Sequence, residues 1–218
     1  MPVPHRSETS ADTRRLYIAF GVALTFVLLL WLLKLVETMS GIDFTQFGIY
    51  PRRAAGLAGI LFAPFIHGSV THLFANTLPI IIMGTLLLYA YPRAAKVLLP
   101  AVYTGGGIAV WLFAREAYHI GASGLAFGLL FFVLTIGIIR WEQRTIALSL
   151  VLFFLYGGMI SGVVPMAHDI SFESHLSGAL IGLILAFPLR HLDPASPSKQ
   201  YSWELEETEV DENDPPDQ

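Results

Sequence analysis

The chain has 218 residues, of which 54% are hydrophobic and only 14% are charged, and it contains no cysteine. This composition excludes a secreted disulfide scaffold, a nucleic-acid-binding domain and an extended disordered chain as the main body. The net charge of −4 belongs to the C-terminal tail, since eight of the 17 acidic residues lie between Tyr201 and Gln218. The sequence therefore predicts an all-α membrane protein that crosses the bilayer several times.

Six segments without Asp, Glu, Lys or Arg are long enough, or nearly so, to cross a bilayer as helices of about 20 residues. In chain order they are 16–33, 54–92, 97–114, 117–139, 145–168 and 174–189. We expect the first to be an uncleaved span, because its apolar run continues without a small-residue cleavage site. The predicted organisation is a cytosolic N-terminal segment (1–14), a six-span domain (15–192) and a disordered acidic cytosolic tail (193–218).

The positions of the basic residues predict how the spans are oriented. With six spans, nine of the 13 Lys and Arg residues fall on one side, which the positive-inside rule makes the cytosolic side. Both termini are then cytosolic, in an integral protein expected in a bacterial inner (plasma) membrane. The loop 38–71 lies on the outer side, and its apolar sequence predicts that it sits partly in the membrane interface. The loop 163–172 is expected to form a cap on the same side.

Four polar side chains lie where apolar residues would be expected. His72 and Asn76 are in the second span, Ser123 opens the fourth, and His175 is near the start of the sixth. Such residues are costly inside a membrane and suggest a functional site. We estimate depth by counting residues back from the basic residues that end these spans. This places Asn76, Ser123 and His175 roughly 22 to 26 Å from the cytosolic boundary, a few ångströms below the outer interface.

These side chains have the chemistry of acyl transfer. Ser123, in Gly121-Ala122-Ser123-Gly124, would sit at a helix N-terminus, where free backbone NH groups favour an oxyanion. His175 could accept the serine proton, since a neutral imidazole is the usual base for a serine nucleophile. His72 and Asn76, four residues apart on one helix, could both donate hydrogen bonds to the oxyanion.

Two small-residue stripes predict that the fourth and sixth spans pack closely. Glycines four residues apart let membrane helices approach each other, and His175 shares a face with the second stripe. The four glycines are Gly124, Gly128, Gly178 and Gly182. If the stripes meet, Ser123 and His175 come within reach of each other.

These motifs, together with the segment from His67 to Asn76 and the run Ser174 to Gly182, resemble the rhomboid family of intramembrane serine proteases over about residues 44–189. The resemblance implies a six-transmembrane-helix rhomboid-like bundle with a Ser-His dyad, in which Ser123 is the nucleophile and His175 the general base. His72, Asn76 and the Ser123 backbone NH would form the oxyanion hole. Other residues of the motifs are expected to have a structural role near the site. They are Phe127, His67 and the glycines Gly121, Gly124, Gly128, Gly178 and Gly182.

The resemblance also implies what the protein acts on. Transmembrane protein substrates would enter from the lipid between the second and fifth spans and be cut near their outer ends, where helix-weakening residues expose the peptide bond. Membrane lipid is the other expected partner, and we expect no nucleic acid, metal or cofactor. Two positions depart from many bacterial members: Phe127 replaces a tyrosine, and Ala58-Gly59 stand near the place of a Trp-Arg pair. These departures leave loop anchoring and substrate preference open.

Three alternatives remain. A rhomboid-like protein without catalytic activity could recognise membrane helices. A zinc enzyme could use His67, His72 and His175, although the chain has no HExxH motif and no carboxylate inside its spans. A small transporter would ordinarily show internal repeats, and none is evident.

Overall fold

The structure, a computed structural model, describes residues 5–165 and 171–193. The predicted acidic tail beyond Asp193 and residues 166–170 of the predicted cap lie outside the described residues. Within the described part, six helical segments are long and apolar enough to cross a membrane. They span Ser10–Ser40, Val70–Ala90, Pro92–Phe113, Ser123–Arg140, Thr145–Val163 and Phe172–Leu189. The prediction of an all-α bundle with six spans is confirmed.

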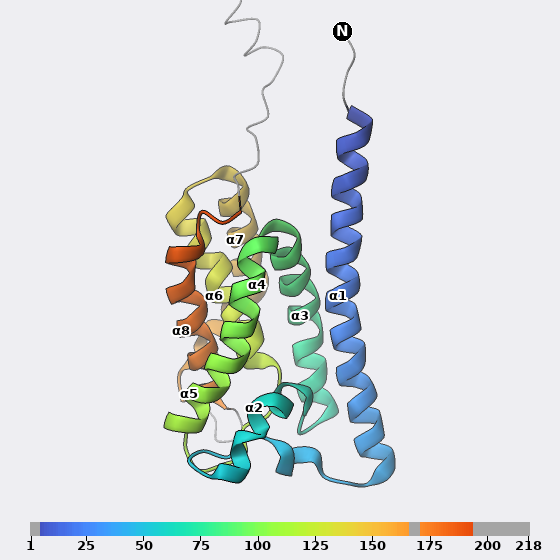
Figure 1. The fold of residues 1–218 in the computed structure, drawn as a ribbon, viewed down its shortest axis with the longest axis vertical. Helices are drawn as coiled ribbons and strands as arrows, with labels where there is room; N and C mark the ends of the chain where they lie inside the picture. The colour runs from blue at the N-terminus through green and yellow to red at the C-terminus, as the bar shows by residue number, and fades with distance from the viewer. Residues whose placement is uncertain (1–4, 166–170, 194–218) are drawn as a thin grey trace, which may run out of the picture.

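Three spans are single α-helices of about the expected length, namely α3 (Val70–Ala90), α6 (Ser123–Arg140) and α8 (Phe172–Leu189). Helix α1 (His5–Ser40) is longer and extends beyond the rest of the bundle (Figure 1). The third span is composite, because a π-helical turn at Ala101–Gly105 joins α4 (Pro92–Pro100) to α5 (Gly106–Phe113). The fifth span joins α7 (Gln143–Tyr156) to a 3-10 helix, η5 (Gly157–Val163).

Helix α6 is the centre of the bundle. Half of its membrane-spanning window is buried, against 11% for the window of the fifth span. Its side chains Leu130, Phe132 and Ile136 are fully buried in the main core cluster, which α3, α4, α7 and α8 complete. Helix α1 packs mainly against α3 and stands at the edge of the molecule (Figure 1). The candidate site is therefore built on the most enclosed helix, whereas α7 is a peripheral wall.

Helices α6 and α8 meet along the two glycine stripes. A Cβ atom added to Gly178 would lie 1.9 Å from the carbonyl oxygen of Gly124, and one added to Gly182 would lie 2.1 Å from that of Gly128. Real Cβ atoms do not approach other atoms so closely, so only glycine allows this backbone contact. The close approach brings the N-terminal ends of α6 and α8 together.

The loop between α1 and α3 carries four short helices: η1 (Phe44–Phe47), η2 (Ala54–Leu57), α2 (Gly59–Phe62) and η3 (Ala63–Phe65). It is tied to the C-terminal end of α5 and to the segment that follows. The indole NH of Trp111 donates to the Arg53 carbonyl at 2.9 Å, and Arg52 donates to the Ala114 carbonyl at 2.7 Å. Ile49 forms an antiparallel bridge with His119. These contacts anchor the loop without a Trp-Arg pair at Ala58-Gly59.

Asp193 closes the opposite end of the bundle. Its two carboxylate oxygens accept hydrogen bonds from the backbone NH groups of Arg93 (3.0 Å) and Ala94 (2.9 Å), at the start of α4. These are NH groups that a helix leaves unsatisfied at its N-terminus, and they favour negative charge. The carbonyl of Asp193 also accepts from Arg140 at 3.0 Å. Asp193, four residues after the end of α8, therefore joins this end of α8 to α4 and to the end of α6.

Candidate active site

Ser123 and His175 form a hydrogen-bonded pair at the end of the bundle where α6 and α8 begin. The Oγ atom of Ser123, the first residue of α6, lies 2.7 Å from Nε2 of His175, in the first turn of α8. Both residues are only 8% exposed. The glycine contact between the two helices makes this distance possible, because the pair lies just beyond the point where the backbones touch.

The other nitrogen of the imidazole contacts a backbone carbonyl. His175 Nδ1 lies 3.0 Å from the oxygen of Gly162 in η5. Since a carbonyl can only accept, Nδ1 carries the proton in this contact, and Nε2 is left to accept the proton of the serine hydroxyl. This is the tautomer that a general base for Ser123 requires.

Phe127 fixes the plane of the imidazole. Its ring stacks on His175 with the centroids 4.2 Å apart and the planes 7° apart. On the same side, a Cβ atom on Gly162 would come within 2.9 Å of Phe127 and 3.1 Å of His175 Nδ1. Glycine at 162 therefore lets η5 lie close enough for its carbonyl to reach the imidazole.

Glu173 does not complete a triad. Its carboxylate faces Arg115, with Oε1 at 3.4 Å from Nη1 and 3.3 Å from the backbone nitrogen. This agrees with the expectation that Glu173, two residues before His175, points to another side of the helix.

His72 lies against the turn that precedes Ser123. Gly121 has φ +106°, and a Cβ atom added there would lie 3.0 Å from His72 Nε2 and 3.9 Å from Ser123 Oγ. The imidazole thus covers the turn that precedes α6. Ser69 caps α3 by accepting from the His72 backbone NH at 3.0 Å, which fixes where the helix begins.

Asn76 is buried one turn further along α3. Its side-chain nitrogen donates to the His72 carbonyl at 2.9 Å. An amide nitrogen has two hydrogens, so one remains for another acceptor. Of the predicted oxyanion donors, His72 lies against Gly121, two residues before Ser123, and Asn76 is engaged within its own helix.

His67 is buried against the turn that precedes Ser123. It is 1% exposed, its Nε2 accepts from the Ala122 backbone NH at 3.4 Å, and its ring meets His72 edge-on at 5.1 Å. Burial lowers the pKa of His67 to about 4, which keeps it neutral and able to accept. Its carbonyl accepts from Lys34 at 2.8 Å. Lys34 lies in the first span, where a cation is costly and signals a contact of this kind.

A chain of polar groups at the start of α8 was missed by the sequence analysis. His119 Nδ1 lies 2.6 Å from the hydroxyl of Ser171, which lies 2.7 Å from that of Ser174. Ser171 caps α8, and its carbonyl accepts from the His175 backbone NH at 3.3 Å. A serine directly before an apolar helix was the available signal, because serine is a preferred N-cap residue. His119 thereby links the loop at Ile49 to the helix that carries His175.

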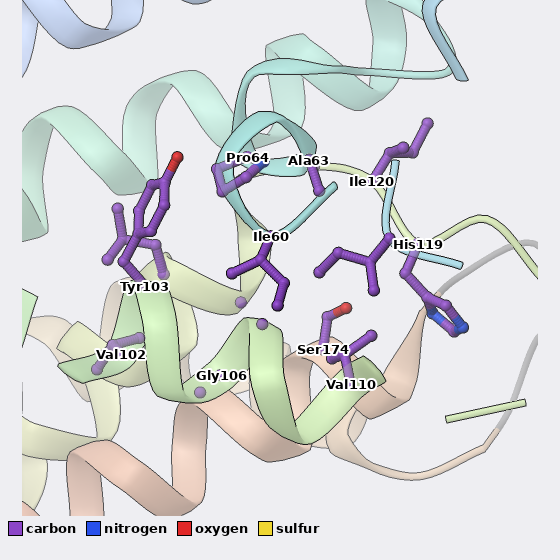
Figure 2. A pocket seen from close by; sticks show the side chains of 16 residues that line it. Ile60, Ala63, Pro64, Val102, Tyr103, Gly106, Val110, His119, Ile120 and Ser174 are labelled. Carbon is purple, nitrogen blue, oxygen red and sulfur yellow. The ribbon is translucent and has the colours of Figure 1, made fainter. Parts of the chain in front are cut away.

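A small cavity of about 40 Å³ lies beside Gly121 and Gly124, behind the serine turn. Figure 2 shows Ile60 and Pro64 on one wall, Tyr103 and Val110 on another, and Ser174 at its edge. A space of this size can hold water where polar partners are available. The lining of this cavity is mostly apolar.

Within residues 5–165 and 171–193, no three His, Cys, Asp or Glu side chains are grouped to hold a metal ion. The described residues therefore offer no ligand set for the zinc enzyme considered above.

Comparison with known proteins agrees with the fold. The family model described as the rhomboid domain matches residues 54–192. Uncharacterized protein Rv1337 of Mycobacterium tuberculosis is 35% identical over 196 residues, which cover 85% of this chain and 82% of that protein. Uncharacterized protein ML1171 of Mycobacterium leprae is 34% identical, over 85% of this chain and 77% of its own length. RHOMBOID-like protein 2 of Arabidopsis thaliana is 29% identical, over 68% of this chain and 45% of that protein. With its six membrane-crossing helices and a domain match over most of the bundle, this integral membrane protein belongs to the rhomboid family of intramembrane proteases.

Proposed function

We propose that the protein is an intramembrane serine endopeptidase that cuts transmembrane segments of other membrane proteins near their outer ends. The observation that carries the proposal is the 2.7 Å contact between Ser123 Oγ and His175 Nε2, with the imidazole held in the tautomer that accepts the serine proton. A buried hydroxyl and imidazole in this arrangement are suited to nucleophilic catalysis.

In the proposed reaction, Ser123 Oγ attacks the carbonyl carbon of the scissile peptide bond while its proton passes to His175 Nε2. The carbonyl oxygen becomes an oxyanion, stabilised by the Ser123 backbone NH, His72 and the free hydrogen of Asn76. Collapse of this intermediate breaks the C–N bond, and the imidazolium gives its proton to the leaving amine. Water, deprotonated by His175, then hydrolyses the acyl-enzyme and releases the second product.

The depth of the dyad supports the proposed position of cleavage. Ser123 begins α6 and His175 lies in the first turn of α8, both at the end of the bundle opposite Asp193. A helical substrate must unwind there to expose its peptide bond, so Gly or Pro near the cut favours cleavage. Because both catalytic residues are 8% exposed, entry requires a wall to move. We assign this movement to α7 and η5, the least buried span, relative to α3.

We also propose an orientation in the membrane, in which both termini are cytosolic and the Ser123–His175 pair lies towards the outer face. The natural chain has no cysteine, so single cysteines introduced at Ser10 and Gln46 provide clean topology probes. A membrane-impermeant maleimide applied to intact cells should label position 46 and not position 10. The opposite pattern would reverse the orientation.

The activity is tested by co-expression with a single-span substrate that carries helix-weakening residues near its outer end. Wild type should release a shortened product, whereas Ser123→Ala and His175→Ala should release none while inserting in the membrane at similar levels. A fluorophosphonate should label wild type at Ser123. Equal cleavage by the alanine variants would overturn the dyad, and an unlabelled, inactive wild type would favour a rhomboid-like protein that only binds membrane helices.

Asn76→Ala should impair the reaction less severely. Removing one oxyanion donor typically costs roughly 3 kcal/mol of transition-state stabilisation, a decrease in turnover of about a hundredfold, because the other donors remain. The measurement is the turnover of a detergent-solubilised substrate, with KM determined separately. Unchanged turnover would remove Asn76 from the oxyanion hole and leave it as a residue that only bonds within α3.

A further inference from the structure

A groove with a volume of about 600 Å³ lies at the end of the bundle remote from the dyad, between α1, α3 and α4. Its rim carries three exposed basic residues, Arg15, Arg93 and Lys96. Its walls are formed mostly by apolar side chains, among them Val22 and Leu88. The groove lies where α3 ends and α4 begins, towards the upper side of the bundle in Figure 1.

The same order of side chains recurs on two helices. On α1, Arg15 is followed by Ile18 and Val22, three and seven residues later and so on one helix face. On α4, Lys96 is followed by Leu99 three residues later. In both helices the cation lies nearer to the end of the bundle and the apolar residues lie deeper. The groove therefore has a positive mouth and an apolar interior.

The positive charge at the mouth is in excess. Asp193 is the acidic residue in the lining, and both its carboxylate oxygens already accept from the backbone NH groups of Arg93 and Ala94. The described residues give neither Arg15 nor Lys96 a carboxylate partner. A groove between membrane helices with several uncompensated cations at one surface attracts an anionic group there.

A ligand that fits both parts must be anionic at one end and apolar along its length. A free phosphate ion would meet the cations and leave the apolar walls unfilled. The acidic tail would supply carboxylates, but it has few apolar side chains to place along Val22 and Leu88. An anionic phospholipid has both features, and the surrounding membrane supplies it at high local concentration.

We propose that the groove between α1, α3 and α4 binds an anionic phospholipid, with the phosphate at Arg15, Arg93 and Lys96 and one acyl chain along Ile18, Val22 and Leu88. The bound lipid joins α1 to the rest of the bundle at the end where α1 extends beyond its neighbours. This inference does not depend on the proposed protease activity.

The test is titration of the purified full-length protein in mild detergent with phosphatidylglycerol, monitored by native mass spectrometry and thermal melting. Phosphatidylcholine with the same acyl chains and inorganic phosphate are the reference ligands. Wild type should retain phosphatidylglycerol and melt at a higher temperature with it than with either reference. Each removed cation should weaken binding about fivefold, so Arg15→Gln with Lys96→Gln should weaken it by about 25-fold.

The matched control removes the same charge outside the groove, by combining Arg14→Gln with Arg190→Gln, two exposed arginines that do not line it. This control and the charge-preserving pair Arg15→Lys with Lys96→Arg should both bind as wild type does. Equal losses in the control and the test pair would overturn the proposal, as would equal stabilisation by inorganic phosphate. Binding that appears only after removal of residues 194–218 would also overturn it and assign the groove to the tail.

Discussion

Phe127 holds the imidazole of His175 by stacking alone, whereas a tyrosine at this position could also form a hydrogen bond. Its ring lies parallel to the imidazole of His175 at 4.2 Å, while the Gly162 carbonyl holds Nδ1. The imidazole is therefore fixed by a ring face and a backbone oxygen. At this position, the departure from many bacterial relatives removes a hydroxyl and retains the packing.

Replacing Phe127 separates these two contributions. Phe127→Leu removes an aromatic contact worth roughly 0.5–1.5 kcal/mol and should lower turnover by up to about tenfold, because the imidazole loses its preferred plane. Phe127→Tyr keeps the stack and should retain most of the activity. The measurement is the rate of fluorophosphonate labelling at Ser123 together with substrate turnover. Phe187→Leu, an exposed position on α8, is the control, and an equal loss in both leucine variants would contradict a specific role of the stack.

The helix pair α6–α8 determines whether the dyad can form. Backbone contact at Gly124–Gly178 and Gly128–Gly182 leaves no room for a Cβ atom on α8, whereas the side chains of Ser123 and His175 lie just beyond this contact. The geometry of the site is thus a property of two helices packed without intervening side chains.

Gly178→Ala tests this dependence. The added Cβ would lie 1.9 Å from the Gly124 carbonyl oxygen, so the helices must separate, and overpacking of this kind typically costs about 1–3 kcal/mol. We expect a lower melting temperature in detergent and loss of cleavage. Gly21→Ala on α1 is the matched control, because nothing lies within 4 Å of its added Cβ. Full activity of Gly178→Ala would show that the dyad tolerates a wider spacing.

The elements differ in how far the sequence could predict them. Long apolar segments predicted the six spans, and the polar residues His72 and Ser123 were noticed because a membrane interior makes them costly. The π turn at Ala101–Gly105 has no comparable local signal, since its residues are as apolar as those of an ordinary helix. The cap of α4 by Asp193 joins residues about 100 positions apart, so no local pattern could reveal it.

For the molecule as a whole, stability should depend on pH through His67. Its pKa is about 4 in the folded protein and about 6.5 when exposed, because burial disfavours the charged form. Between these values the unfolded chain binds a proton that the folded protein does not, so stability falls as pH decreases from about 6.5 to about 4. The loss attributable to this group is about 3 kcal/mol at most.

His67→Gln keeps an acceptor for the Ala122 NH and removes the titration. The variant should lose less thermal stability than wild type between pH 6.5 and 4.5, measured by melting in detergent. His191→Gln, at an exposed position, should follow the wild-type profile. Parallel profiles for wild type and His67→Gln would assign the acid sensitivity to other groups.

The oxygen that faces His175 Nδ1 belongs to the main chain at Gly162. Side-chain replacement cannot delete it, so a mutational scan for groups that position His175 would pass over this oxygen. Removing that acceptor calls for backbone chemistry, such as a thioamide at Gly162 introduced by semisynthesis, which weakens the hydrogen bond and leaves the sequence unchanged.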